Sequence, residues 1–513
     1  VSFEKKKQQQ EEAKQKTVQT ADVVRVTSDQ LENLVNLAGE TSIFRSRLEQ
    51  QMSVLRYNLE EMSSTVDRLR DQLRNLDIET DASGSLYCTG YFMNSIDVDP
   101  SSGIETLTSE GGKDIFVSKT SSSGELLWGF SLGNALECTG QLITTDALGN
   151  IIVSGYFNGA VDFDPGPDEY ILNSTVYKDI FIASYSADGA FLWAGDIKSN
   201  HYIECTSIAV NEEGAIHLLG NFQGTTDFDP GADAFPLPVT TSQDSYLLTL
   251  TSSGDFINCK TFGGSYACYG QDMAFDQSGS LYITGFFLGS CDFDPGISEF
   301  TLSSSSLRDG FVVKLNPELN FQWAQTLKGA ANVKCESIDT GIDDRIWIGG
   351  SFEGNVNFDP ALDPSQELMN FGSEDIFLCS FESSGDYIGV GHFGGSNKDC
   401  LAGIDVDPLG FVYLLGYHKG DCDIDPEDSE LIITASGSWS GFLSKIDTSG
   451  TLNWGAQLDG SSLDQTNEVK IDGGGNVFVA GHFQGNIDCD PSSGSFLLTT
   501  SGSNDGVLLK LEQ

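Results

Sequence analysis

The spacing of hydrophobic and polar residues changes near residue 80. Before it, apolar residues follow one another at alternating steps of four and three, which is the spacing of a heptad seam. After it, apolar and β-branched residues alternate in short runs that are separated by Gly, Asp, Ser and Asn. The first pattern predicts helices, and the second predicts short antiparallel strands.

The helical pattern lies within residues 23–80. Thr27 and Gln30 form a capping-box pattern at its start, and no Gly or Pro falls between residues 40 and 81. The segment is therefore predicted to be an all-α coiled coil, as one long helix or as a hairpin of two. Its apolar stripe can be buried only against another helix, in a coiled coil or a helical bundle. The interface residues would be Leu31, Leu34, Ala38, Leu48, Met52, Leu55, Leu59, Met62, Val66, Leu69, Leu73 and Leu76.

The strand pattern repeats seven times in residues 81–513. A D-x-D-P tetrad begins at Asp97, Asp162, Asp227, Asp292, Asn357, Asp423 and Asp488, so the period is about 65 residues. Each unit has four apolar runs, here called strands a to d in chain order. Four strands in each of seven units predict a mainly β fold, a seven-repeat β-propeller.

The count of strands predicts that the first or last blade is incomplete. Strands b and c each occur seven times, the first b strand at Leu86, whereas strands a and d each occur only six times. The shortage is a hairpin of strands d and a that should precede Asp81. We therefore expect the helical segment to join the propeller where one blade lacks half of its strands.

Composition supports a boundary near residue 80. The chain has 513 residues and a formal charge of −48. Residues 1–80 contain 12 basic and 14 acidic residues, whereas the remainder contains 15 and 61. Residues 1–22 are charged and rich in Gln, which is typical of a flexible linker. So acidic a propeller should repel nucleic acid, and no apolar run is long enough to insert into a membrane.

The D-x-D-P carboxylates are the candidate metal ligands. Two Asp residues two positions apart point the same way in an extended segment and could hold calcium together. The alternative is structural, because Asp also organises turns by accepting backbone hydrogen bonds. The candidates are Asp97, Asp99, Asp162, Asp164, Asp227, Asp229, Asp292, Asp294, Asp359, Asp423, Asp425, Asp488 and Asp490.

The other reactive residues predict no catalytic site. Five of the eleven cysteines (Cys138, Cys205, Cys268, Cys335 and Cys400) recur at nearly the same place in successive units, which is typical of buried apolar positions. A disulfide such as Cys259 with Cys268 is possible, but no Cys/His spacing predicts zinc. The five His residues are scattered, and no phosphate-binding loop or G-x-S-x-G motif occurs. We therefore expect no enzymatic activity.

Two family resemblances follow from the residues themselves. VRVTSDQLENLVNLAGETSIFRSRLEQQ and LEEMSSTVDRLRDQLRNLDIET, within residues 23–80, resemble the dimerisation domain of CheA-type histidine kinases of the pilus-motility branch. That likeness implies a two-helix hairpin that forms a four-helix bundle in the dimer. The repeats resemble SBBP-type bacterial β-propeller repeats through G-x-F-x-G-x-x-D-F-D-P-G and a later D-x-F.

The two resemblances imply different functions. The first implies the homodimerisation segment of a two-component chemotaxis kinase, fused to a propeller scaffold as a fragment or chimera. No phosphoacceptor His precedes His201 and no ATP-binding motif follows, so phosphotransfer is not expected. The second implies a secreted or surface propeller that binds a protein or glycan and has acquired a helical dimeriser. The kinase resemblance implies a cytoplasmic protein, and the propeller resemblance an extracellular one.

Overall fold

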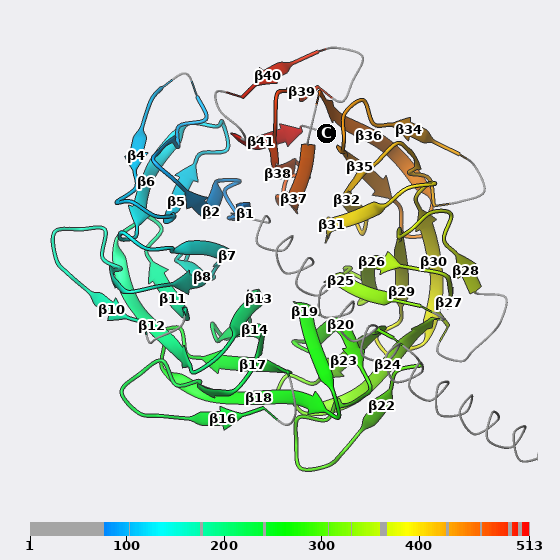
Figure 1. Ribbon diagram of the computed structural model, residues 1–513, viewed down its shortest axis with the longest axis horizontal. Coiled ribbons are helices and arrows are strands. Elements are labelled where there is room, and N and C mark those ends of the chain that lie inside the picture. Colours follow the sequence, from blue (N-terminus) through cyan, green and yellow to red (C-terminus); the bar gives the residue numbers. More distant parts are fainter. Residues whose placement is uncertain are drawn as a thin grey trace, which may run out of the picture. The chain divides into compact units, whose positions relative to one another are not determined.

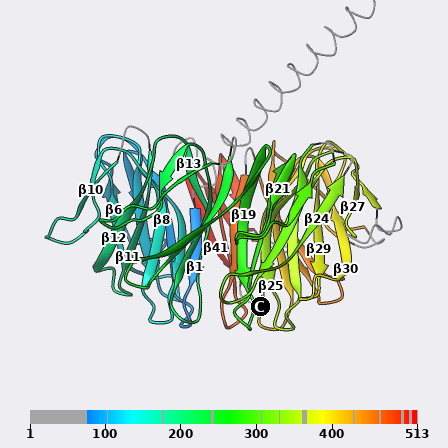
Figure 2. The same cartoon turned by 90° about the horizontal axis from the view of Figure 1, so that it is seen from below.

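The structure is a computed structural model of the 513-residue chain. It describes residues 76–511, with gaps at 102, 175–177, 240–242, 306, 330, 360–366, 427–429, 462–463, 491–494 and 501–504. Within these residues every regular element is a strand. Seven sheets of three or more strands form the blades, which surround a common axis, and three two-stranded sheets are separate hairpins (Figures 1 and 2). The predicted seven-repeat propeller is confirmed.

Each blade begins with an inner strand a, followed outward by strand b. The inner strands are β1 (Leu76–Thr80), β7 (Thr139–Thr145), β13 (Ile203–Val210), β19 (Ala267–Phe275), β25 (Val333–Thr340), β31 (Asp399–Val406) and β37 (Asp464–Ile471). The b strands are β2 (Leu86–Phe92), β8 (Ile151–Phe157), β14 (Ile216–Phe222), β20 (Leu281–Leu288), β26 (Ile346–Phe352), β32 (Val412–His418) and β38 (Val477–Phe483).

Strands c and d complete the blade on its outer side. The c strands are β5 (Asp114–Thr120), β11 (Asp179–Tyr185), β17 (Asp244–Leu250), β23 (Asp309–Leu315), β29 (Asp375–Phe381), β35 (Ser440–Ile446) and β41 (Asp505–Leu511). The d strands are β6 (Leu126–Leu132), β12 (Phe191–Ser199), β18 (Phe256–Gly264), β24 (Phe321–Gly329), β30 (Tyr387–Phe393) and β36 (Leu452–Gly460). Blades one to six therefore have four strands, and blade seven has three within the described residues.

A short hairpin connects strands b and c in every blade. These hairpins are β3 (Ser95–Asp97) with β4 (Thr106–Thr108), β9 (Ala160–Asp162) with β10 (Ile171–Asn173), β15 (Thr225–Asp227) with β16 (Pro236–Pro238), β21 (Ser290–Asp292) with β22 (Thr301–Ser303), β27 (Asn355–Asn357) with β28 (Glu367–Met369), β33 (Asp421–Asp423) with β34 (Ile432–Thr434), and β39 (Asn486–Asp488) with β40 (Leu497–Thr499). Four of them also pair with strand d of the preceding blade, as β15 does with β12, and so link neighbouring blades.

The repeated glycine of strand b lies where a side chain would collide with strand a. A Cβ on Gly155 would lie 2.0 Å from the carbonyl oxygen of Thr139, and one on Gly350 would lie 2.0 Å from that of Lys334. Beside this close approach strand a carries a register shift, for example between Cys335 and Ser337. The backbones can come this close only because the residue has no side chain.

Apolar side chains fill the spaces between successive blades. Tyr87, Ile115 and Val117 of blade one, for example, pack in one cluster with Ile151 and Val153 of blade two. A further cluster joins Phe478 and Ala480 of blade seven to residues of blade one, and this contact closes the ring. That cluster has eight buried residues, whereas the other six have at least twelve each. The closing interface therefore has the smallest core.

The predicted all-α segment ending at residue 80 is wrong. Residues 76–80 form strand β1, which pairs with β2 from Leu76↔Gly90 to Thr80↔Leu86, and no helix occurs within the described residues. LDIET alternates charged and β-prone residues, so its period of two fits a sheet, and Leu76 matched the heptad only as its last position. Within the described residues blade one therefore has its inner strand, and strand d of blade seven is the one strand not seen. Residues 1–75, with the other predicted interface positions from Leu31 to Leu73, lie outside the described residues.

Candidate functional site at an open blade edge

Asp162 and Asp164 are representative of the D-x-D-P carboxylates. Asp162 Oδ1 accepts hydrogen bonds from the backbone N–H of Asp164 (3.1 Å) and of Tyr170 (2.8 Å), which lie on both sides of the hairpin loop. Asp164 Oδ1 accepts one from Gly166 (2.8 Å). The first Asp therefore holds the loop closed, and the second shapes the turn that follows it.

The same geometry recurs in the other blades. Asp97, Asp227, Asp292, Asp423 and Asp488 each accept the corresponding two backbone hydrogen bonds, and Asn357 Oδ1 accepts the shorter-range one from Asp359. None of these pairs converges with a third His, Cys, Asp or Glu side chain in the described part of the chain. Calcium binding by the tetrads stays a prediction.

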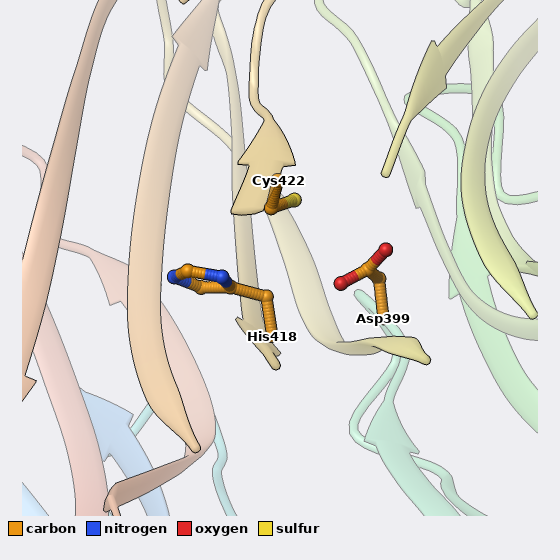
Figure 3. A group of neighbouring side chains, drawn as sticks. All are labelled: Asp399, His418 and Cys422. Carbon is orange, nitrogen blue, oxygen red and sulfur yellow. The ribbon is translucent and has the colours of Figure 1, made fainter. Parts of the chain in front are cut away.

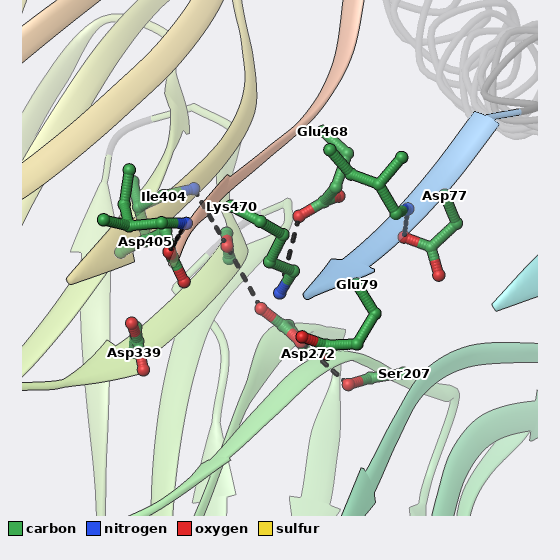
Figure 4. Close-up of polar contacts among 12 residues, drawn as sticks. Asp77, Glu79, Ser207, Asp272, Asp339, Ile404, Asp405, Glu468 and Lys470 are labelled. Carbon is green, nitrogen blue, oxygen red and sulfur yellow. Dashed lines mark hydrogen bonds and ion pairs between the residues drawn. The ribbon is translucent and has the colours of Figure 1, made fainter. Parts of the chain in front are cut away.

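Acidic side chains from the inner strands lie close together in a polar cluster (Figure 4). Several accept a hydrogen bond from the backbone of the next inner strand. Asp77 accepts the N–H of Ile143 (2.7 Å), Asp339 that of Val406 (2.7 Å) and Asp405 that of Ile471 (2.6 Å). Asp272 bridges blades three to five, because it accepts Ser207 Oγ (2.8 Å), Ser337 Oγ (3.1 Å) and the N–H of Ile338 (2.9 Å). These carboxyls stabilise the contacts between blades.

Burial and mutual repulsion shift the pKa values of the ionisable groups in this cluster. Burial raises the pKa of Asp77 to about 7 and that of Asp339 to about 6. Burial of Lys470 would lower its pKa, but the negative charges of Glu468 and Asp405 raise it well above the usual range. Lys470 is thus held as a cation among carboxyls. The carboxyl groups accept hydrogen bonds from backbone amides and serine hydroxyls, so the role of this cluster is primarily structural.

Strand β41 of blade seven is exposed along its outer edge. In blades two, three, five and six every residue of strand c is buried, and so is every residue of β5 in blade one. In β41, by contrast, only Val507 and Leu509 are buried, while Gly506 and Lys510 are exposed. β41 pairs with β38 alone among the described strands. Among the described strands none pairs with the outer side of β41, which is therefore an edge of the described sheet.

A groove of about 900 Å³ runs along this edge. One wall is β41, from Asp505 to Leu508, and the opposite wall is β3 and the residues after it, including Val98 and Pro100. Apolar and aromatic side chains line its floor, among them Leu76, Leu86, Phe92, Phe116 and Ala480. Leu76, predicted as a dimer-interface residue, thus belongs to the propeller and lines this groove.

The other blades show what would fit such a groove. In blade two, strand d (β12) lies between strand c of its own blade and the hairpin of the next blade. The last apolar residue of each d strand is buried, and these residues are Leu132, Ile197, Phe262, Leu327, Phe393 and Leu458. In blade seven the same two walls, β41 and β3, border the groove. The groove therefore has the position and the walls of a strand d.

A second anchoring contact is available beside the groove. Trp128, Trp193 and Trp323 of strands d donate Nε1–H to the carbonyl oxygens of Ala187, Ser252 and Ser383, each in the turn before strand d of the next blade. At the two ends of the ring, Lys510 Nζ donates to the corresponding oxygen of Ser122 (2.8 Å). Lys314 makes the same contact with Ser383 (3.1 Å) beside Trp323. The Ser122 carbonyl is thus placed to accept a Trp as well.

The thiols are arranged differently from the sequence-based expectation. Cys268 forms a disulfide with Cys291, not with Cys259. Cys138, Cys205, Cys335 and Cys400 form no disulfide and are buried, as expected for apolar positions. Sequence analysis found no Cys/His cluster, yet Asp399, His418 and Cys422 come together in blade six. The H-x₃-C spacing of the last two was the available signal, but Asp399 lies on another strand.

Comparisons with known proteins support the propeller alone. No family model matches the chain. An uncharacterized WD repeat-containing protein L264 of Acanthamoeba polyphaga mimivirus is 22% identical over 436 residues, covering 71% of this chain and 31% of that protein. The regulatory protein FlaEY of Caulobacter vibrioides is 22% identical over 311 residues, covering 58% of this chain and 31% of that protein. The chain thus spans about a third of the length of these curated relatives.

Solved structures add only distant likenesses. Sqt1 from Chaetomium thermophilum covers 79% of this chain and 94% of its own, with 9% identity and a TM-score of 0.37. A protein of unknown function from Bacteroides caccae covers 60% and 80%, with 8% identity and a TM-score of 0.32. These scores carry no functional argument. Neither the comparisons nor the described residues support a kinase dimerisation segment, and no described helix could cross a membrane.

Proposed function

We propose that the propeller is a non-catalytic binding module that takes up an extended protein segment by β-strand addition at blade seven. The outer edge of β41, with which no described strand pairs, carries this proposal, because a strand d covers the equivalent strands of blades one to six. Backbone groups of the ligand would pair with β41, and alternate side chains would enter the groove. The ligand is then a protein rather than a glycan.

The six strands d define the sequence that the groove should prefer. In each strand d, the residues on the face turned to the core start with an aromatic or aliphatic side chain and finish with the last, buried apolar residue. In β12 these two residues are Phe191 and Ile197. The third position is Trp in four blades, including Trp193. A ligand with this pattern would bury its apolar residues against Leu508 and Phe116, and its Trp could reach the Ser122 carbonyl.

A labelled peptide with the sequence of residues 121–133 (SSSGELLWGFSLG) tests the proposal by fluorescence anisotropy with the full chain. Saturable one-to-one binding is expected. A control peptide that replaces the Trp and the last Leu by Ser should bind at least tenfold more weakly, since about 3 kcal/mol or more of apolar burial is lost. Equal binding of both peptides would contradict the assignment.

A variant chain supplies the matched control on the protein side. Residues 123–133 appended after Gln513 would provide strand d in cis, because five residues would then separate it from Leu511, as many as the turn between strands c and d has in blade one. This variant should no longer bind the labelled peptide and should unfold at a higher temperature. Unchanged peptide binding by the appended chain would show that the peptide binds elsewhere.

A further inference from the structure

Three side chains of blade six lie side by side, and one of them, His418, has no counterpart in the other blades. Asp399 begins β31, His418 ends β32, and Cys422 is the middle residue of β33 (Figure 3). A carboxylate oxygen, a ring nitrogen and the Sγ atom of the three residues all lie within 4.8 Å of one another. All three side chains are buried, with relative exposures of 0%, 0% and 1%.

The equivalent positions elsewhere are largely apolar. Asp399 pairs with the end of strand b in blade six. The residue in this position is Ile203 in blade three, Cys268 in blade four, Val333 in blade five and Asp464 in blade seven. The end of strand b is Phe in every other blade where blade six has His418. Where blade six has Cys422, blades two, five and seven have Val161, Val356 and Ile487, whereas blade four has Cys291, which forms a disulfide there. Two polar groups and a thiol thus replace a packed apolar contact.

Two of these side chains have buried polar atoms without a hydrogen bond of normal geometry in the described part of the chain. They are Oδ1 of Asp399 and Nε2 of His418. The remaining contacts fix both groups, because Asp399 Oδ2 accepts the N–H of Gly395 (2.7 Å) and His418 Nδ1 lies 3.1 Å from the Gly420 carbonyl oxygen. A buried polar atom that is left unpaired costs about 1–3 kcal/mol. A bound ligand would remove that cost.

We propose that Asp399, His418 and Cys422 form a binding site for a divalent transition metal, with zinc as the best match. Imidazole, thiolate and carboxylate are the three ligand types of protein zinc sites, and the sulfur excludes calcium and magnesium. Tetrahedral coordination would bring the ligand atoms to about 3.5 Å from one another, so a closure of roughly 1 Å is required.

Charge balance also favours a divalent cation. In a metal site a cysteine binds as the thiolate, an aspartate as the carboxylate and a histidine as the neutral imidazole. Binding M²⁺ releases the thiol proton and any carboxyl proton, and the resulting M²⁺–thiolate–carboxylate–imidazole group has no net charge.

The same groups do not fit a nucleophilic triad. A catalytic Cys needs a lowered pKa and access to substrate, whereas Cys422 is buried and the pKa of its thiol is raised. The residues that reach solvent nearest to the site are those of the turn before β33, where Lys419 and Asp421 are exposed. Opening of this turn would give an ion access, but it would not admit a peptide or glycan.

Metal analysis of the full chain tests the inference. The protein is dialysed against Zn²⁺ in a non-chelating reductant, and bound metal is counted by mass spectrometry. One zinc per chain is expected. Loading with Co²⁺ should give a thiolate-to-cobalt charge-transfer band in the near ultraviolet, and the affinity should rise as pH increases because protons are released.

Variants that restore the residues of other blades should remove the metal without unfolding the protein. His418→Phe and Asp399→Val should lower bound zinc at least tenfold and abolish the cobalt band. Cys138→Val, which changes a buried thiol in blade two, should retain both. If wild type binds less than about 0.1 equivalent of zinc per chain, the three residues are a hydrogen-bonded cluster alone and the inference is overturned. It is also overturned if folded His418→Phe keeps its zinc. The zinc measurement is independent of the peptide-binding test, because the metal site lies in blade six and the groove lies beside blade seven.

Discussion

Asp464 should destabilise the folded protein at neutral pH, and replacing it by Val should relieve this cost. The residue begins β37, is 1% exposed, and neither carboxylate oxygen has a hydrogen bond of normal geometry within the described residues. Burial and then the charge of Asp459 raise its pKa from 3.8 to about 7. Val333 occupies the equivalent position of blade five, so Val fits the surroundings of strand a.

The sign and size of the effect follow from the raised pKa. Because the folded protein binds this proton more tightly than the unfolded chain does, the stability contributed by the protonated carboxyl is complete below pH 4 and is lost as pH rises through 7. A shift of about three units corresponds to about 4 kcal/mol at full ionisation. Asp464→Val should therefore gain about 2–4 kcal/mol at pH 8.5 and much less at pH 4.5.

Urea unfolding of both proteins, followed by Trp fluorescence at pH 4.5 and 8.5, measures this difference. Asp233→Asn, which removes an exposed carboxyl of blade three, is the control and should change stability little at either pH. A gain of the same size at both pH values would mean that apolar packing alone is responsible. A loss of stability at pH 8.5 would refute the burial cost.

Two further changes test how the blades are held together. Asp272→Ala should lower the free energy of unfolding by about 2–3 kcal/mol, because Ser207, Ser337 and the Ile338 amide lose their shared acceptor. Asp272→Asn keeps one acceptor oxygen and should lower it less. Thermal unfolding compares the two variants, and equal losses would exclude the acceptor role. Cys268 and Cys291 can be replaced by Val, the residue at both positions in blade five. The loss of the disulfide, which closes a loop of 23 residues, should lower the free energy of unfolding by about 3 kcal/mol and abolish the effect of reductant on the melting temperature. A reductant effect that persists would mean that another disulfide is responsible.

The repeat made much of the propeller predictable. The 65-residue period, the order of four strands and the glycine in strand b are local patterns, and the structure has each of them. In the turn between strands a and b, Asp344 has a positive φ (57°) where Gly149 and Gly214 stand in other blades, so Asp takes the same backbone conformation there. The shortage of one strand d was visible as well, and this led to the candidate groove.

The first inner strand was missed because two patterns overlap at Leu76. A period of two in LDIET is only five residues long, and it follows a heptad pattern that continues to the same Leu. Pairing with β2 decides the outcome, since it is the sheet that buries Ile78 completely. The propeller therefore begins before residue 81, and local periodicity was insufficient to place that boundary.

The sequence by itself determined the number of blades, the strand pattern and the acidic character of the propeller, because these repeat at a fixed period. Only the tertiary structure decided which side chains meet. Cys268 faces Cys291, and Asp399 faces His418 and Cys422, because antiparallel pairing brings strands a and b and the hairpin together across about twenty residues. The exposure of β41 was likewise decided in three dimensions, since a sheet edge is open only where no neighbouring strand covers it.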